Sequence, residues 1–121
     1  MGDGLTVTVR REDGPAVITV SGEVDLSTVS LLRERLFELA DSGEPFIVDL
    51  EQVTFIDSTG LGALVGAYRR VAAHGGSLHV VCAQRQARKL LSLTGVDQRV
   101  RLSASLEEAL ASVAAARDTA G

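Results

Sequence analysis

The stretch Asp57-Ser58-Thr59-Gly60 holds the residues of this sequence that best suit regulated chemistry. It follows the apolar connector 53–56 and precedes a helical pattern, so Ser58 is predicted at the N-cap of a helix. One interpretation is structural, because a serine cap stabilises a helix by about 1 kcal/mol. The other is functional: a helix N-terminus accommodates phosphate. A phosphate on an exposed Ser58 would add about −1.5 to −2 charges and alter a binding surface.

A glycine-rich stretch, residues 60–66, opens the same helix and raises the question of nucleotide binding. Glycines between a strand and a helix are typical of dinucleotide sites. The fingerprint is incomplete, because the next strand ends at Cys82 without an acidic residue to hold a ribose. The alternative is packing: Gly62 and Gly66 lie on one helix face, where a backbone or a partner could approach closely. Such contacts would offset the loss of helix stability, roughly 1 kcal/mol for each glycine relative to alanine.

Other catalytic or metal chemistry finds little support. The two histidines, His74 and His79, are predicted at a helix end and inside a strand, and no Gly-x-Ser-x-Gly elbow surrounds Ser58. The single cysteine, Cys82, lies in an apolar run and is interpreted as a buried thiol. We therefore predict no catalytic residue, no metal, no cofactor and no enzyme activity.

The strands that must position Ser58 are indicated by apolar spacing. Residues 5–9 alternate and residues 16–21 are β-branched, with the turn Asp13-Gly14-Pro15 between them, which predicts a hairpin. Residues 46–50 and 78–82 are nearly continuous apolar runs, typical of strands buried on both faces of a parallel sheet. A short edge strand is predicted around residues 100–102.

Helical spacing alternates with these strands. A first helix is predicted after an N-cap at Ser27, a second from Ser58 to the Gly75-Gly76 pair, and a third over 85–94. A capping box at Ser105 opens the fourth, which is expected to end near Ala114. The order predicts an α/β domain with a mixed, mostly parallel sheet and about four flanking helices. We expect one domain over 1–121, with a core at about 5–114 and a frayed tail at 115–121.

Composition excludes several classes of partner. The net charge is −4 and no basic run with interleaved aromatics occurs, so nucleic acid is not an expected partner. No apolar stretch approaches the roughly 20 residues of a membrane span. Residues 1–4 do not open a signal peptide. A cytoplasmic protein without a membrane partner is expected.

Four segments together resemble a known family. The sequence Phe55-Ile56-Asp57-Ser58-Thr59-Gly60-Leu61-Gly62 resembles the signature of STAS-domain anti-sigma factor antagonists. Gly22-Glu23-Val24-Asp25 is similar to the family's second motif, Gly75-Gly76-Ser77-Leu78 to its helix-to-strand turn, and residues 90–96 to its third helix. The resemblance runs from about Leu5 to Val113 and implies a single STAS-type domain.

The resemblance also implies a function in bacterial partner switching. The unphosphorylated protein would bind an anti-sigma factor that is also a serine kinase of the histidine-kinase-like ATPase fold, which frees a sigma factor for transcription. The kinase would phosphorylate Ser58 and a serine phosphatase would reset it. The partner-binding residues implied are Asp25, Asp57, Ser58, Thr59, Gly60 and Leu61.

Two alternatives stay open at this point. One is a STAS scaffold or interaction module without a phosphorylation cycle, and the other is a nucleotide-binding protein that uses residues 60–66. The acidic residues also have plain structural interpretations. Asp57 would then only favour the helix dipole, and Asp25 would only hold the turn before Ser27.

Overall fold

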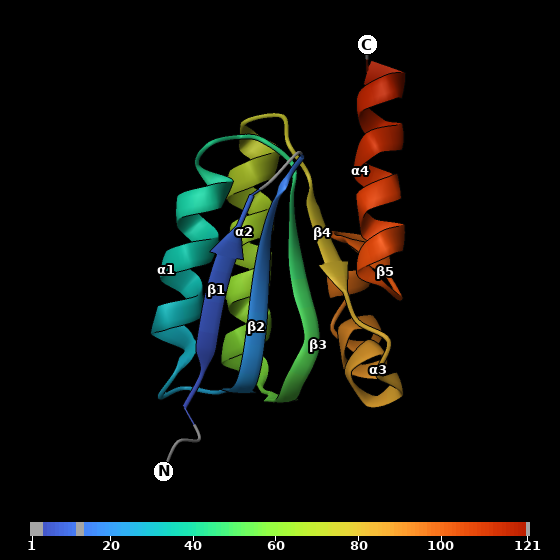
Figure 1. Cartoon of the computed structure of the whole chain (residues 1–121). Coiled ribbons are helices and arrows are strands. Elements are labelled where there is room, and N and C mark those ends of the chain that lie inside the picture. Colours follow the sequence, from blue (N-terminus) through green and yellow to red (C-terminus); the bar gives the residue numbers. More distant parts are fainter. Residues whose placement is uncertain (1–3, 12–13, 121) are drawn as a thin grey trace.

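Five strands form one mixed sheet in the computed structural model, which describes residues 4–11 and 14–120. They are β1 (Thr6–Arg10), β2 (Ala16–Val24), β3 (Phe46–Ile56), β4 (Leu78–Val81) and β5 (Arg101–Ser103), and they lie in sequence order across the sheet. β1 runs antiparallel to β2, and every other neighbouring pair is parallel (Figure 1). The predicted hairpin and the mostly parallel α/β sheet are confirmed.

The helices cover both faces of this sheet (Figure 1). α1 (Val29–Ala40) and α2 (Ser58–Ala73) lie side by side on one face, and α4 (Leu106–Ala120) packs on the other. α3 (Arg85–Leu93) leads into η1 (Val96–Gln98), a short 3₁₀ turn before β5. None of the helices in the described residues is long and apolar enough to cross a membrane.

The larger core is aliphatic and lies between the sheet and the α1–α2 pair. Parallel strands place alternate side chains on one face, and α1 and α2 each present an apolar stripe to them. Burying a Val, Leu or Ile side chain contributes about 1.5–3 kcal/mol, so this layer supplies most of the apolar stabilisation. Its fully buried members include Ile18, Val20, Leu32, Leu36, Val48, Leu64, Val71 and Val80.

A smaller core lies under α4. Val17, Ile47 and Val81 point to this face of the sheet and pack against Ala109 and Val113. Burial on both faces explains why the third and fourth strands read as continuous apolar runs.

The start of α1 and the end of α4 differ from those predicted. The N-cap position of α1 is Thr28 rather than Ser27. The carboxylate of Asp25 accepts hydrogen bonds from the backbone N–H groups of Ser27 and Thr28, which holds Ser27 in a turn before the helix. α4 opens as predicted, with the Ser105 hydroxyl accepting from the Glu108 N–H at 3.1 Å, but continues to Ala120. Residues 115–120 of the tail that was expected to fray are therefore helical. Residues 1–3, and Asp13 of the predicted turn, lie outside the described residues.

Candidate functional site

The parallel register of β2 and β3 brings two distant segments together. Val24 pairs with Ile56, so the residues that follow each strand leave the sheet at the same edge. The Asp57 N–H donates to the Val24 carbonyl at 3.1 Å, which ties the two strand ends to each other. Asp25 therefore lies close enough to Asp57 for its charge to affect the pKa of Asp57, and Ser58 follows Asp57 directly in the chain.

The N-cap of α2 is Asp57, not Ser58 as predicted. One oxygen of its carboxylate accepts from the Thr59 N–H at 2.9 Å, from the Gly60 N–H at 3.3 Å and from the Thr59 hydroxyl. The Thr59 hydroxyl contributes most to holding the pKa of Asp57 below its ordinary value, while burial and the charge of Asp25 oppose that shift. Asp57 is therefore an ionised cap.

Ser58 is the first residue of α2 and is exposed. Within residues 4–11 and 14–120, its hydroxyl makes no hydrogen bond. Because Asp57 already serves the backbone N–H groups of the first turn, capping does not occupy this hydroxyl. Serine and aspartate are both strong N-caps, so their adjacency in the sequence did not reveal which of them would take the role.

Asp25 has a structural role as well as a place at this edge. Its Oδ1 accepts from the Ser27 hydroxyl at 2.7 Å and from the Ser27 N–H at 2.9 Å. The Ser27 hydroxyl is the main reason why the pKa of Asp25 is lowered. Thr28 extends the network, because its hydroxyl donates to the Glu23 carbonyl at 2.8 Å. The turn interpretation of Asp25 is therefore correct, and it places a second ionised carboxylate beside Asp57.

Gly60 and Leu61, which we expected at a contact surface, are buried. A Cβ at Gly60 would lie 2.7 Å from side-chain atoms of both Val24 and Ile56, so only glycine lets α2 sit this close to the two strand ends. Leu61 is 5% exposed and packs in the larger core. Both residues position the first turn of α2, whereas the half-buried Thr59 stays at its edge.

The two later glycines of α2 differ in their surroundings. A Cβ at Gly66 would meet the ring of Phe37 on α1 at 3.0 Å, but one at Gly62 would meet nothing within 4 Å. A close contact within the chain is thus found at Gly66, whereas at Gly62 only the alternative of a close partner stays open. Gly62 lies one turn after Ser58 and is exposed, so it leaves the surface beside Ser58 smooth.

Two exposed apolar side chains border the acidic edge and were not singled out from the sequence. Leu26 is 77% exposed and follows Asp25, while Phe55 on β3 is 51% exposed. The available signal was a large aliphatic residue inside a polar loop, between Asp25 and Ser27. Leu26 and Phe55 add apolar surface to a site that otherwise carries carboxylates and a hydroxyl.

Neither histidine lies near Ser58. His79 on β4 pairs with Ile47 at the start of β3, whereas Ser58 follows the end of that strand. His74 is the C-cap of α2, so the whole helix separates it from Ser58. No cluster of three potential metal ligands occurs in the described residues.

Sequence and structure comparisons agree on the family. The family model described as STAS domain matches residues 6–109. The anti-sigma-F factor antagonist RsfB of Mycobacterium tuberculosis is 34% identical over 116 residues, covering 95% of this chain and 94% of that protein. The anti-sigma-B factor antagonist of Bacillus subtilis is 32% identical over 103 residues, covering 85% and 94%.

Solved structures show the same architecture. The crystal structure of an anti-sigma factor antagonist from Mycobacterium paratuberculosis has 31% identity and a TM-score of 0.84, and the match covers 93% of this chain and 97% of that one. The Bacillus protein SpoIIAA in its phosphorylated form shares the fold at 23% identity, with a TM-score of 0.69 and 89% and 99% coverage. On the family match over residues 6–109 and these relatives, the chain belongs to the STAS domain family.

Proposed function

We propose that this protein is an anti-sigma factor antagonist, a cytoplasmic regulator of bacterial transcription that acts by binding and is not an enzyme. The observation that carries the proposal is the exposed, unbonded Ser58 hydroxyl beside the ionised Asp57 and Asp25. The names of the relatives, which describe antagonists of anti-sigma factors, support it. The unphosphorylated form binds an anti-sigma factor and thereby frees a sigma factor.

The proposed contact surface combines three kinds of group. Asp25, Asp57 and Thr59 supply polar contacts, Ser58 lies at their centre, and the exposed Leu26 adds apolar area. Gly60 and Leu61 hold this turn against the sheet from beneath. Basic groups on the surface of a partner complement the charge of this edge, and apolar groups of the partner can pack against Leu26.

Phosphorylation of Ser58 is the proposed off-switch. In this cycle the partner, a serine kinase of the histidine-kinase-like ATPase fold, transfers the γ-phosphate of ATP to the Ser58 hydroxyl. Asp57 occupies the N–H groups of Thr59 and Gly60, so a phosphate finds few free donors in the helix and projects outward. It adds about −1.5 to −2 charges beside two carboxylates, which releases the partner. A serine phosphatase reverses the step.

Reconstitution with a purified partner tests this function. The anti-sigma factor of the source cell is captured on the immobilised chain, identified, and prepared as a recombinant protein. With ATP it is expected to add one phosphate to the wild-type chain at Ser58, seen by intact mass and peptide mapping, and none to Ser58→Ala. The phosphorylated chain is expected to bind roughly a hundredfold or more weakly than the unmodified chain.

The two alternatives give different results in the same experiment. A STAS scaffold without a phosphorylation cycle would bind its partner but stay unmodified. A nucleotide-binding protein would itself bind labelled ATP in the absence of any partner. Either result would replace the proposed function.

A further inference from the structure

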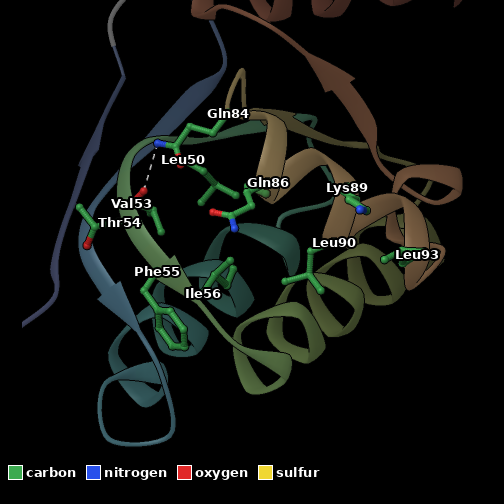
Figure 2. Close-up of a pocket in the computed structure, with 11 residues that line it drawn as sticks. Leu50, Val53, Thr54, Phe55, Ile56, Gln84, Gln86, Lys89, Leu90 and Leu93 are labelled. Carbon is green, nitrogen blue, oxygen red and sulfur yellow. Dashed lines mark hydrogen bonds between the residues drawn. The ribbon is translucent and has the colours of Figure 1, made fainter.

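A groove of about 380 Å³ opens between the end of β3 and α3 (Figure 2). Leu50, Val53 and Ile56 line it from β3, and Leu90 and Leu93 line it from α3. In Figure 2, Leu90 and Ile56 point toward each other across it. The described part of the chain therefore leaves an apolar hollow on its surface that none of its own helices fills.

Two of the most exposed large apolar side chains border this groove. Leu93 is 74% exposed on the α3 side, and Phe55 projects on the β3 side. Monomeric proteins rarely expose contiguous apolar patches larger than a few hundred Å², and larger patches mark interaction sites. The patch combines a hollow with two projecting side chains, and such a surface complements one apolar side chain presented by another protein.

The groove continues into the surface around Ser58. Ile56 lines the groove and is followed directly by Asp57 and Ser58 in the chain. Phe55 is paired in the sheet with Glu23, which is exposed. A partner that covers Ser58 and its carboxylates would therefore need little further extension to reach the groove.

Opposite charges flank the groove on its two sides. Glu23 and Asp57 lie on the side of Ser58, whereas the exposed Lys89 lines the α3 side. Glu51, near the Gln84 end, is occupied by a hydrogen bond from the Ala83 N–H at 3.1 Å. The surface thus offers an apolar hollow with an acidic margin on one side and a basic margin on the other.

We propose that this groove binds an apolar anchor of the same anti-sigma factor. The occupant is an amphipathic segment with one Leu, Ile, Met or Phe side chain seated between Phe55 and Leu93. Basic residues of the segment face Glu23 and Asp57, and an acidic residue faces Lys89. This inference rests on the proposed function and divides the interface into a switch at Ser58 and an anchor that phosphorylation leaves intact.

The test separates the anchor from the switch by substitutions at exposed positions. Leu93→Ser and Phe55→Ser remove apolar surface without adding charge. The matched control is Leu110→Ser on α4, where the side chain is 40% exposed and does not line the groove. Calorimetry against the purified anti-sigma factor measures affinity, and thermal melting of each variant monitors the fold.

Leu93→Ser and Phe55→Ser are each expected to lower the affinity at least about tenfold, as removal of a buried anchor does. Leu110→Ser is expected to stay within about twofold of the wild type. Hydrogen exchange is expected to show that the complex protects residues 85–93 and leaves α4 unchanged. In the Ser58→Asp background, Leu93→Ser is expected to remove the residual weak binding. Since Leu93 is mostly exposed, its variant keeps the test valid even if Phe55→Ser unfolds.

Three results would overturn the inference. If both groove variants bind like the wild type while Ser58 is still phosphorylated, the anchor is wrong and the proposed function stands. If the wild-type chain neither binds nor is phosphorylated by the anti-sigma factor, both proposals fail. If Leu93→Ser instead abolishes a dimer seen by sedimentation without changing partner affinity, the groove joins two copies of this chain.

Discussion

Replacing Ser58 by aspartate or by alanine separates signalling from helix capping. Because Asp57 and not Ser58 caps α2, alanine at position 58 removes no cap and should change the free energy of unfolding by less than about 0.5 kcal/mol. Aspartate at the first helical residue gains about 0.3–1 kcal/mol from the helix dipole, and repulsion by the ionised Asp57 offsets part of this gain. Both variants should therefore remain close to the wild type in stability.

Partner binding should respond very differently to the two changes. Alanine adds no charge, so its affinity for the anti-sigma factor should stay within about threefold of the wild type. Aspartate adds a third carboxylate beside Asp25 and Asp57, in a surface that loses water on docking. Like-charge juxtaposition in an interface costs several kcal/mol and each 1.4 kcal/mol is tenfold in affinity, so a loss of roughly a hundredfold or more is expected.

The assay is calorimetry with the purified partner, with urea unfolding of each variant in parallel. Ala111→Asp, at an exposed position on α4, carries the same added charge far from Ser58 and should bind normally. Equal affinities for Ser58→Asp and Ser58→Ala would refute the reasoning, because a negative charge at position 58 would then be irrelevant to docking.

Three further predictions concern Asp25, two glycines of α2 and His79. Asp25→Asn keeps an Oδ1 acceptor for Ser27, so the melting temperature of this variant should stay within about 3 °C of the wild type. Its affinity for the partner should fall. Unfolding at room temperature would show that the charge of Asp25 itself holds the turn. Gly60→Ala should lose about 1–3 kcal/mol on urea unfolding through overpacking, whereas Gly62→Ala should gain up to about 1 kcal/mol, and the reverse order would contradict the packing described. Burial, aided by the Arg101 charge, lowers the pKa of His79 from 6.5 to about 4. Between pH 6.5 and pH 4, His79 therefore binds a proton in the unfolded chain but not in the folded one. Stability should thus be complete above about pH 6.5 and fall by roughly 2 kcal/mol toward pH 4.5; His79→Gln should flatten this dependence in urea titrations, and an unchanged slope would assign it to other groups.

Separating an anchor from a switch has a consequence for the regulatory cycle. If the groove between β3 and α3 holds the partner loosely in both phosphorylation states, the phosphorylated chain stays near its partner. Binding at the groove raises the effective concentration of the partner at the second contact, the surface around Ser58. Dephosphorylation at Ser58 would then restore binding without a new diffusional search.

The sequence by itself determined the class of fold and the order of its elements. Alternation in strands and 3.6-residue spacing in helices are local patterns, so each segment carries its own assignment. The runs at 46–50 and 78–82 also indicated strands covered on both faces. The exit of Asp25 and Asp57 at one edge followed from the expectation of parallel neighbouring strands.

Local patterns could not choose between adjacent residues with the same propensity. Asp57 and Ser58 are both good caps, as are Ser27 and Thr28, and spacing alone does not distinguish them. The tie between the Asp57 N–H and the Val24 carbonyl places Asp57 outside the helix and Ser58 inside it. That contact joins two strands, so it is absent from either segment alone.

Exposure was decided only by the tertiary structure. Gly60, Gly62 and Gly66 all lie at the start of the same predicted helix, yet one lies against two strand ends, one is open and one meets α1. The groove depends on Phe55 and Leu93, which are far apart in the chain and are left uncovered on either side of it. Whether a side chain is buried depends on which distant elements pack over it, because solvent is excluded by neighbours in space and not by neighbours in sequence.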